Sequence, residues 1–296
     1  MVSGVAEYKM NNKTYFTMKT IKMFLELKEL VRENAKTLRI AAVKPDDDAT
    51  QAALQQIEGE GLAEVVTISN DIPEEAAREA VALVRNGEAD VLMKGLIGTD
   101  QLLRAVLNKE TGVLPQGHVL THIAAAEIPA YQKLLFFTDA AVIPYPTHEQ
   151  RIEQVRYASH VCRRLGIDEP RIALIHCAEH GGKQFPFVDG YADIRQMAAS
   201  GAFGQCLVDG PMDVKTACSL KALQAKHMTS PLNGEADVLV MPDIEAGNVF
   251  YKTLTLFAAS KTAGMLCGAQ CPVVVPSRGD SAEAKFNSIL LALASI

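Results

Sequence analysis

Short apolar runs alternate with amphipathic segments along most of the chain. Each run ends in a polar residue or a glycine, and a stretch with the periodicity of a helix follows it. The runs over residues 238–241 and 273–275 are apolar at every position, which is typical of strands that a parallel sheet buries on both faces. This regular alternation of strand and helix predicts an α/β fold.

The pattern gives approximate bounds for each element. Strands are predicted over residues 39–43, 64–68, 90–93, 133–137, 171–175, 205–208, 237–240 and 272–275. Helices are predicted over residues 20–36, 47–56, 73–86, 100–108, 149–165, 192–200, 214–226, 249–260 and 281–294. Pro73 suits the first turn of its helix, because a proline there gives up no helical hydrogen bond.

Two prolines interrupt the alternation at Ile143-Pro-Tyr-Pro-Thr147. Proline fixes extended backbone and therefore suits a stiff connection between domains. We place a domain boundary near residue 143, so that residues 144–270 form a second α/β unit. The pattern alone leaves the last strand and helix, from residue 271 on, assignable to either unit.

The charge balance argues against two classes of partner. The chain carries 29 Lys+Arg and 35 Asp+Glu, a formal net charge of −6, whereas nucleic acid and anionic membranes attract concentrated positive charge. No apolar run approaches the ~18 to 20 residues of a membrane-spanning helix. The N-terminal segment lacks the apolar core of a signal peptide, and the six cysteines include no C-x-x-C pair. We therefore expect a cytoplasmic protein with reduced thiols and no nucleic-acid or membrane partner.

The residues that follow the predicted strands are unusually polar, and an open parallel sheet binds its ligands there. The strongest candidate is the segment 277–281, Ser-Arg-Gly-Asp-Ser, between the last strand and the last helix. The free N–H groups of a helix start and the guanidinium of Arg278 both favour phosphate. The same segment also suits a helix cap by Ser277 or Ser281 beside a solvated arginine. The residues alone leave both interpretations open.

Other strand ends carry further candidates. Lys94-Gly-Leu-Ile-Gly-Thr99, followed by Arg104, combines glycines that permit close backbone approach with a hydroxyl at a helix start, but it lacks the order of a P-loop. Asp139, Asp243 and Asn248 follow two other strands and are expected at the same cleft. Helix capping explains Thr99 and Asp243 at least as well as ligand binding.

Several familiar site motifs are missing. The cluster His176-Cys177-Ala-Glu-His180 contains metal-ligand residue types, but its spacing matches no standard zinc site. Neither G-x-G-x-x-G nor G-x-S-x-G occurs, which argues against dinucleotide oxidoreductases and serine hydrolases. We therefore expect a phosphate-competent pocket at the strand ends and no metal site.

The chain from about residue 90 to its end resembles the phosphate acetyl/butyryltransferase family, segment by segment and in the same order. The matching segments are Lys94-Gly with Thr99 and Arg104, Asp139-Ala-Ala-Val-Ile-Pro-Tyr-Pro-Thr-His-Glu-Gln150, Val208-Asp-Gly-Pro211, Ser230-Pro-Leu-Asn-Gly-Glu-Ala-Asp237, and Asp237 to Lys252 continuing to Gly268 to Ser281. Ile244-Glu-Ala-Gly247 and the run to Glu283 look nearer to phosphate butyryltransferases than to phosphate acetyltransferases.

The resemblance implies reversible transfer of a short-chain, butyryl-like acyl group between CoA and inorganic phosphate, with thiolate attack on acyl phosphate in the reverse direction. It implies acyl-CoA, phosphate and acyl phosphate as partners, CoA as a substrate, and no cofactor or metal. It also implies an isocitrate/isopropylmalate-dehydrogenase-like fold of two α/β domains with parallel-rich sheets. Residues 271–296 would join residues 1–143, the active site would lie in the cleft between the domains, and the chain would form a homodimer or higher homo-oligomer.

The resemblance also implies roles for named residues. Ser277 would hydrogen-bond the tetrahedral intermediate. Arg278, Thr99 and Arg104, with Lys94 beside them, would hold the phosphate or acyl phosphate.

One position departs from the family pattern. The acetyltransferases place a base aspartate seven residues after the serine, and Ala284 stands there in this chain. On a helix Asp280 lies one turn before Ala284 on the same face, whereas Glu283 is rotated by about 100°. We therefore expect Asp280 to deprotonate the CoA thiol, with Glu283 as the second choice.

Three alternatives remain at this point. Phosphate acetyltransferase is the nearest, because one methylene in an apolar pocket discriminates by only ~1 to 3 kcal/mol. The missing carboxylate at Ala284 keeps open a non-catalytic acyl-CoA or phosphate-binding relative, since fold does not imply function. A nicotinamide-dependent decarboxylating dehydrogenase would need metal-binding aspartates and a cofactor loop that the sequence does not show.

Overall fold

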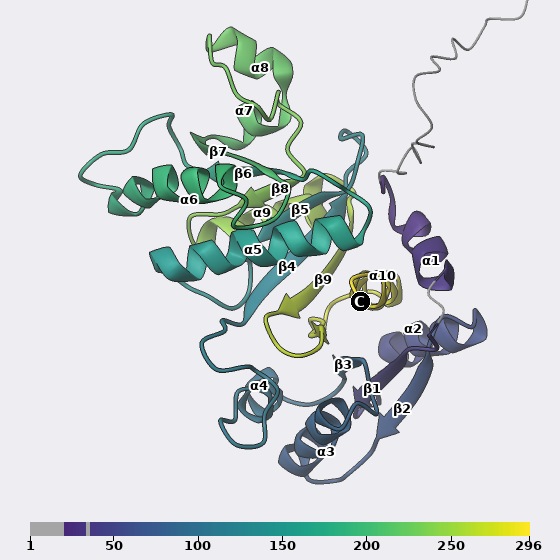
Figure 1. Ribbon diagram of the computed structural model, residues 1–296. Coiled ribbons are helices and arrows are strands. Elements are labelled where there is room, and N and C mark those ends of the chain that lie inside the picture. The colour runs from purple at the N-terminus through teal and green to yellow at the C-terminus, as the bar shows by residue number, and fades with distance from the viewer. Residues whose placement is uncertain (1–20, 34–35) are drawn as a thin grey trace, which may run out of the picture.

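The computed structural model describes residues 21–33 and 36–296, and these residues form one ten-stranded sheet with helices on both faces (Figure 1). The strands are β1 (Arg39–Val43), β2 (Glu64–Ile68), β3 (Val91–Lys94), β4 (Thr121–Glu127), β5 (Leu135–Thr138), β6 (Arg171–Ile175), β7 (Leu207–Met212), β8 (Val238–Val240), β9 (Lys261–Cys267) and β10 (Val273–Val274). Their order across the sheet is β2-β1-β3-β10-β9-β4-β5-β8-β6-β7. The predicted α/β class is confirmed.

Two strands were not predicted from the sequence pattern, and both are antiparallel to their neighbours. All eight predicted strands are present, but β4 and β9 were not expected. β9 pairs antiparallel with β10 and β4, and β4 pairs antiparallel with β5. Their sequences, THIAAAE and KTAGMLC, are rich in small residues and have few of the β-branched residues that mark strands. These two strands join the parallel groups on either side into one sheet.

The helices cover the sheet on two sides (Figure 1). They are α1 (Phe24–Glu33), α2 (Asp48–Gly59), α3 (Pro73–Arg85), α4 (Thr99–Val106), α5 (His148–Arg164), α6 (Gly190–Ala199), α7 (Val214–Cys218), α8 (Leu220–Ala225), α9 (Ile244–Phe257) and α10 (Ala282–Ala294), with a short 3-10 helix over Pro186–Asp189. Helices α1, α2, α5, α6 and α10 share one core, and α3 and α4 share another. Helices α7 and α9 pack with a third core.

Side-chain alternation along the strands explains these separate cores. Ile40 and Ala42 of β1 belong to the core beneath α2 and α10, whereas Ala41 and Val43 belong to the core beneath α3 and α4. Successive side chains of a strand point to opposite faces, so a strand with helices on both sides must be apolar throughout. The continuous apolar runs of the sequence have this cause.

Some helix bounds differ from the prediction. The helix expected over residues 214–226 is two short helices, because Ser219 is extended and caps α8 by accepting the N–H of Ala222. Helix α9 begins five residues earlier than expected, at Ile244, because Asp243 accepts the N–H of Ala246 and caps it there. The expected helix over residues 20–36 is observed as α1, and residues 20, 34 and 35 lie outside the described residues.

The C-terminal helix is the most enclosed helix of the described chain. Every residue from Lys285 to Ala294 is buried, α10 packs against α1, α2 and β9, and β10 pairs in parallel with β3. The ammonium of Lys285 binds Asp47 Oδ1 at 2.6 Å and Thr50 Oγ1 at 2.8 Å, which offsets the cost of burying its charge. The division into domains near residue 143 stays a prediction.

Two findings bear on the wider sequence expectations. No helix in the described part of the chain is both long and apolar enough to cross a membrane. The six cysteines are free thiols, of which Cys162 and Cys271 are buried and Cys177 is exposed.

Candidate active site

A cavity of about 310 Å³ lies where β10 and β5 end and where α4 and α9 begin. Four residues singled out from the sequence line it: Thr99, Asn248, Ser277 and Asp280. Its volume falls within the ~300–1,000 Å³ of small-molecule sites. Thr99, Ser277 and Asp280 follow the carboxyl ends of β3 and β10, which are parallel neighbours, as expected for ligand sites of a parallel sheet. The loop at residues 140–142 follows β5, which runs in the opposite direction because three antiparallel pairings separate it from β10.

The segment after β10 forms a turn that its own residues hold together. Asp280 Oδ2 accepts the N–H of Ser277 at 2.8 Å, and the N–H of Asp280 donates to Ser277 O at 3.1 Å. Ser281 then caps α10 by accepting the N–H of Ala284 at 3.2 Å. Within the described residues, the Ser277 hydroxyl and the Arg278 guanidinium make no hydrogen bond or ion pair. The cap and the candidate binding groups are therefore different residues of one turn.

The two carboxylates proposed as base occupy different places. Asp280 lines the cavity, and its Oδ1 makes no hydrogen bond with a described residue. Glu283 is exposed, pairs with Lys261 at 2.8 Å and does not line the cavity. The geometry therefore favours Asp280 over Glu283 for any chemistry in this cavity.

The loop after β3 is built around a buried lysine. Lys94 Nζ donates to Gly95 O at 3.1 Å and to Ile97 O at 3.2 Å. Burial lowers the pKa of Lys94, and the positive charges of Arg278 and Lys285 lower it further against the opposing attraction of Asp47. Lys94 therefore shapes the loop that leads to Thr99 and does not itself line the cavity.

Arg104 lies outside the cavity lining. Its side chain is 72% exposed and pairs with Asp100 one helical turn earlier, whereas Leu103 next to it lines the cavity. The role of Arg104 in phosphate binding stays a prediction.

Asp139 is saturated by hydrogen bonds. The carboxylate is buried, and it accepts from the backbone N–H groups of His122, Ala141, Val142 and Ile143 and from the hydroxyl of Thr121. Its role in the structure is to fix the loop whose residues 140–142 form one wall of the cavity.

The other two cleft candidates lie on α9. Asp243 caps the helix through the N–H of Ala246 at 2.8 Å and does not line the cavity. Asn248 lines it and donates from Nδ2 to Ala140 O at 3.2 Å. Asn248 therefore ties α9 to the loop at residues 140–142.

Sequence reasoning missed several residues of the lining. His122 and Gly264 lie on β4 and β9, the strands that were not expected, and Tyr251 and Lys252 lie one helical turn after Asn248. Tyr251 and Lys252 lie within the segment that resembles the family, but the sequence did not predict them as site residues. The only feature of the sequence that could have indicated His122 is its place as a titratable side chain within the mostly apolar stretch from Thr121 to Ala126.

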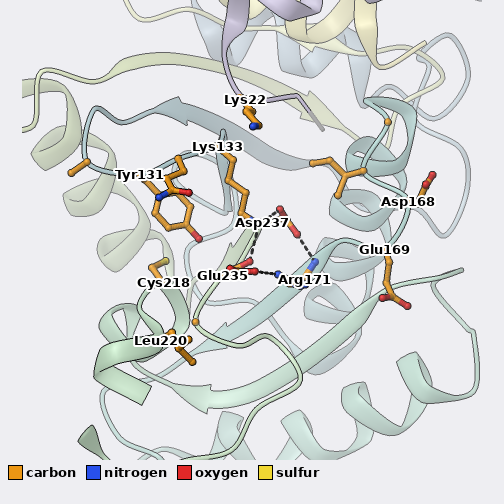
Figure 2. Close-up of a pocket in the computed structure, with 15 residues that line it drawn as sticks. Lys22, Tyr131, Lys133, Asp168, Glu169, Arg171, Cys218, Leu220, Glu235 and Asp237 are labelled. Carbon is orange, nitrogen blue, oxygen red and sulfur yellow. Dashed lines mark hydrogen bonds and ion pairs between the residues drawn. The ribbon is translucent and has the colours of Figure 1, made fainter. Parts of the chain in front are cut away.

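A larger hollow, of about 670 Å³, lies at the amino ends of β5, β6 and β8 (Figure 2). Four of its charged side chains form two ion pairs, Lys133 with Asp237 and Arg171 with Glu235. Asp237 also accepts the N–H of Arg171 at 2.8 Å. None of the candidate catalytic or phosphate-binding residues named from the sequence lines this hollow, although Gly234, Glu235 and Asp237 of the segment that resembles the family do.

The histidine and cysteine cluster after β6 forms no metal site in the structure. His176 is buried against the rings of Phe185 and Phe187, at 4.8 and 5.7 Å between ring centroids. Across the described residues, no group of three or more His, Cys, Asp or Glu side chains is placed to hold a metal ion.

Comparison with known proteins places the chain among acyltransferases that use phosphate. The family model described as "Phosphate acetyl/butaryl transferase" matches residues 17–293. A phosphate butyryltransferase of Clostridium beijerinckii is 42% identical over 220 residues, 74% of this chain and 72% of that protein. A phosphate acetyltransferase of Thermotoga maritima is 33% identical over 290 residues, 91% of this chain and 98% of that protein.

A solved structure agrees with these sequence relatives. A branched-chain phosphotransacylase from Enterococcus faecalis V583 superposes with a TM-score of 0.78 at 30% identity, over 88% of this chain and 99% of that chain. The likeness confirms the α/β fold that the resemblance implied.

Proposed function

Because the chain belongs to the phosphate acetyl/butyryl transferase family, we propose that its cavity is the site where a short-chain acyl group passes between CoA and inorganic phosphate. The observation that carries the proposal is the gathering of Thr99, Ser277 and Asp280 around one cavity, with Arg278 on the same turn. Hydroxyls, a free guanidinium and a carboxylate suit a phosphate anion and a proton transfer.

The reaction needs no covalent enzyme intermediate. In one direction the CoA thiol loses its proton to Asp280, and the thiolate attacks the carbonyl carbon of the acyl phosphate. The tetrahedral intermediate then collapses, the carbon–oxygen bond to phosphate breaks, and phosphate leaves as HPO4²⁻ with the proton that Asp280 had accepted. In the other direction Asp280 takes the proton of HPO4²⁻ as a phosphate oxygen attacks the thioester carbon. The carbon–sulfur bond then breaks, and the leaving thiolate takes that proton from Asp280.

Each candidate residue has a separate task in this reaction. A free thiol has a pKa of about 8.5, so a base or a positive neighbour must assist its ionisation. Ser277 donates to the oxyanion, and Arg278 with Thr99 holds the phosphate. Preorganised donors of this kind commonly lower a barrier by several kcal/mol.

The walls of the cavity support an acyl chain longer than acetyl. Its apolar lining comes from Leu103, Leu266 and Val275 together with residues 140–142. Each methylene buried in such a pocket is worth ~1 to 3 kcal/mol of discrimination. We therefore propose a preference for acyl groups of three to five carbons, with phosphate acetyltransferase as the second candidate because acetyltransferases are also relatives.

The first expected result is phosphate-dependent release of CoA, which a thiol reagent measures. Acetyl-, propionyl-, butyryl- and isobutyryl-CoA are compared with and without phosphate, and with a chelator present. We expect a C3 to C5 thioester to exceed acetyl-CoA by ~10-fold or more in kcat/KM, with no loss of activity on chelation. A clear preference for acetyl-CoA would support the second candidate, and loss of activity with chelator would contradict the metal-free mechanism.

We also propose that the protein is a homodimer or higher homo-oligomer. Helix α9 exposes three large apolar side chains, Val249 at 65%, Leu256 at 73% and Phe257 at 79%. Exposed apolar patches of this kind commonly mark protein interfaces. Asn248 and Tyr251 of the same helix line the cavity, so an interface on α9 would also stabilise the wall of the cavity that α9 forms.

Introducing a charge on α9 tests this assembly. We expect Leu256→Asp to shift the mass in light scattering from that of an oligomer to that of a single chain, because the carboxylate would be desolvated at the interface. Ile72→Asp, a change at another exposed apolar residue, is the matched control and should leave the mass unchanged. A parent protein that is monomeric at micromolar concentration would contradict the proposal.

The expected substrates also support a cytoplasmic location. CoA thioesters and acyl phosphates are multiply charged, and charged groups cross an apolar bilayer only at a large energetic cost. An enzyme that uses them therefore has to share their compartment.

A further inference from the structure

One histidine of the cavity has unused hydrogen-bonding capacity at both ring nitrogens. His122 lies on β4 and lines the cavity together with Ser277 and Asp280. Its Nδ1 is buried and has no hydrogen-bond partner among the residues that the structure describes. Its Nε2 makes no hydrogen bond within the described residues either. Polar atoms inside proteins are nearly always paired, so a group left this way calls for an explanation.

The two nitrogens stand in different surroundings, and this difference selects the tautomer. A proton on the buried Nδ1 would be a donor with no acceptor, and orphaned buried N–H groups are rarer than unsatisfied acceptors. Nε2 is not enclosed in this way, and the residue lines the cavity. The favoured form is therefore the neutral ring with its proton on Nε2.

The surroundings also oppose protonation of the ring. Burial lowers the pKa of His122, and the carboxylates of Asp139 and Asp280 oppose that effect without reversing it. The other titratable residues that line the same cavity are Tyr251 and Lys252 of α9. Asp139 is already saturated by other donors, so it offers no acceptor to Nδ1. His122 therefore stays an uncharged donor near neutral pH.

A glycine on the neighbouring strand makes room for the ring. A Cβ at Gly264 would lie 2.6 Å from His122 Nε2, closer than real contacts allow, and at a tight 3.1 Å from Cε1. The backbone N–H of Gly264 donates to Ser288 Oγ at 3.0 Å, a bond that any residue could make. The absence of a side chain at this position therefore serves the placement of His122.

We propose that His122 is a catalytic hydrogen-bond donor whose Nε2–H binds the acyl carbonyl oxygen as negative charge develops on it. The inference rests on the proposed acyl transfer and adds to it a second oxyanion donor beside Ser277. A neutral imidazole suits this task because it supplies a donor without a mobile proton that would compete with Asp280. Such a donor is most effective when it is fixed before the reaction, as the packing against Gly264 provides.

The kinetic test compares two substitutions of one residue. His122→Leu removes the donor, and we expect kcat to fall by ~10²-fold, the usual loss for one oxyanion donor. His122→Gln places an amide N–H near the position of Nε2, and we expect it to regain at least ~10-fold of that loss. The acidic limb of the pH–rate profile should persist in both variants, because Asp280 is still present.

Several outcomes would overturn the inference. It fails if His122→Leu keeps parental kcat, if His122→Gln is no better than His122→Leu, or if either variant loses the acidic limb, which would make the histidine the base. A parent protein without phosphate-dependent CoA release would instead contradict the proposed function itself. Circular dichroism and thermal melting of each variant separate loss of the donor from loss of the fold.

A measurement independent of activity checks the tautomer. Nitrogen-15 NMR of the histidine-labelled protein, with His122→Gln to assign the signal, should show a neutral ring protonated at Nε2 at pH 7. A ring protonated at Nδ1, or a charged ring, would overturn the inference.

A double substitution tests the role of Gly264. We expect Gly264→Ala to lower kcat by ~10-fold or more, because displacing a preorganised donor weakens it. In the His122→Leu background the same change should have little further effect, since neighbours that act through one contact are not additive. Equal losses in both backgrounds would show that Gly264 acts independently of the histidine.

Discussion

Asp280→Asn should lower turnover by ~10²- to 10⁴-fold, the range for loss of a general base. The acidic limb of the pH–rate profile should disappear with it, because protonation of Asp280 is what removes the base at low pH. The substitution is well suited to the structure. Asparagine keeps an oxygen that can accept the N–H of Ser277, so the turn that Asp280 Oδ2 now holds at 2.8 Å is preserved.

The matched control is the neighbouring carboxylate. Glu283→Gln makes the same chemical change at an exposed residue that pairs with Lys261 and does not line the cavity, and we expect kcat within a few-fold of the parent. Asp280 also lies just before α10, where a carboxylate stabilises a helix by about 0.3 to 1 kcal/mol, so the melting temperature is measured alongside. Full activity of Asp280→Asn with an unchanged pH profile would exclude it as the base.

Arg278→Lys should lower turnover by at least ~10²-fold, as removal of one preorganised donor does. A guanidinium binds phosphate through two parallel N–H groups, and an ammonium does not reproduce that planar fork. No described residue engages Arg278 by a hydrogen bond or ion pair, so the substitution breaks no contact that stabilises the fold. A loss of activity can therefore be assigned to the substrate.

A second arginine provides the comparison for this test. Arg85→Lys makes the same change at the exposed end of α3, where the guanidinium's one hydrogen bond to a described residue is to Glu110 O at 3.4 Å. It should leave turnover and melting temperature unchanged. If Arg278→Lys behaves like Arg85→Lys, Arg278 is a solvated surface charge and phosphate is held elsewhere.

The location of the candidate site was predictable from local chemistry. Ser277, Asp280 and Thr99 each come directly after a buried strand, and the carboxyl ends of parallel strands meet at one edge of a sheet. The same reasoning placed Asp139 and Asp243 at the cleft, yet the first is saturated by backbone donors and the second caps α9. Sequence position cannot distinguish a carboxylate that binds backbone from one that faces a ligand, because the two differ only in orientation.

The choice between the two candidate bases required the tertiary structure. Helical geometry ranked Asp280 before Glu283 on the premise that both lie on one helix. That premise was wrong, because α10 begins at Ala282 and Asp280 lies in the turn before it. Only the packing of β9 beside that helix showed that Lys261 takes Glu283 away from the cavity. The sequence could not predict this ion pair between β9 and α10, because it did not predict β9 itself.

The sequence by itself determined the α/β class and eight of the ten strands. Strand and helix periodicities are local, so they can be recognised before the tertiary neighbours of each element are known. Only the tertiary structure decided how these strands join. β4 and β9 are alanine- and glycine-containing strands whose stability comes from their antiparallel pairing across the middle of the sheet. His122 and Gly264 meet the cavity through that pairing. Pairing between strands that are distant in the chain produces no periodic pattern in the sequence. That pairing is nevertheless what brings the last residues to the candidate site.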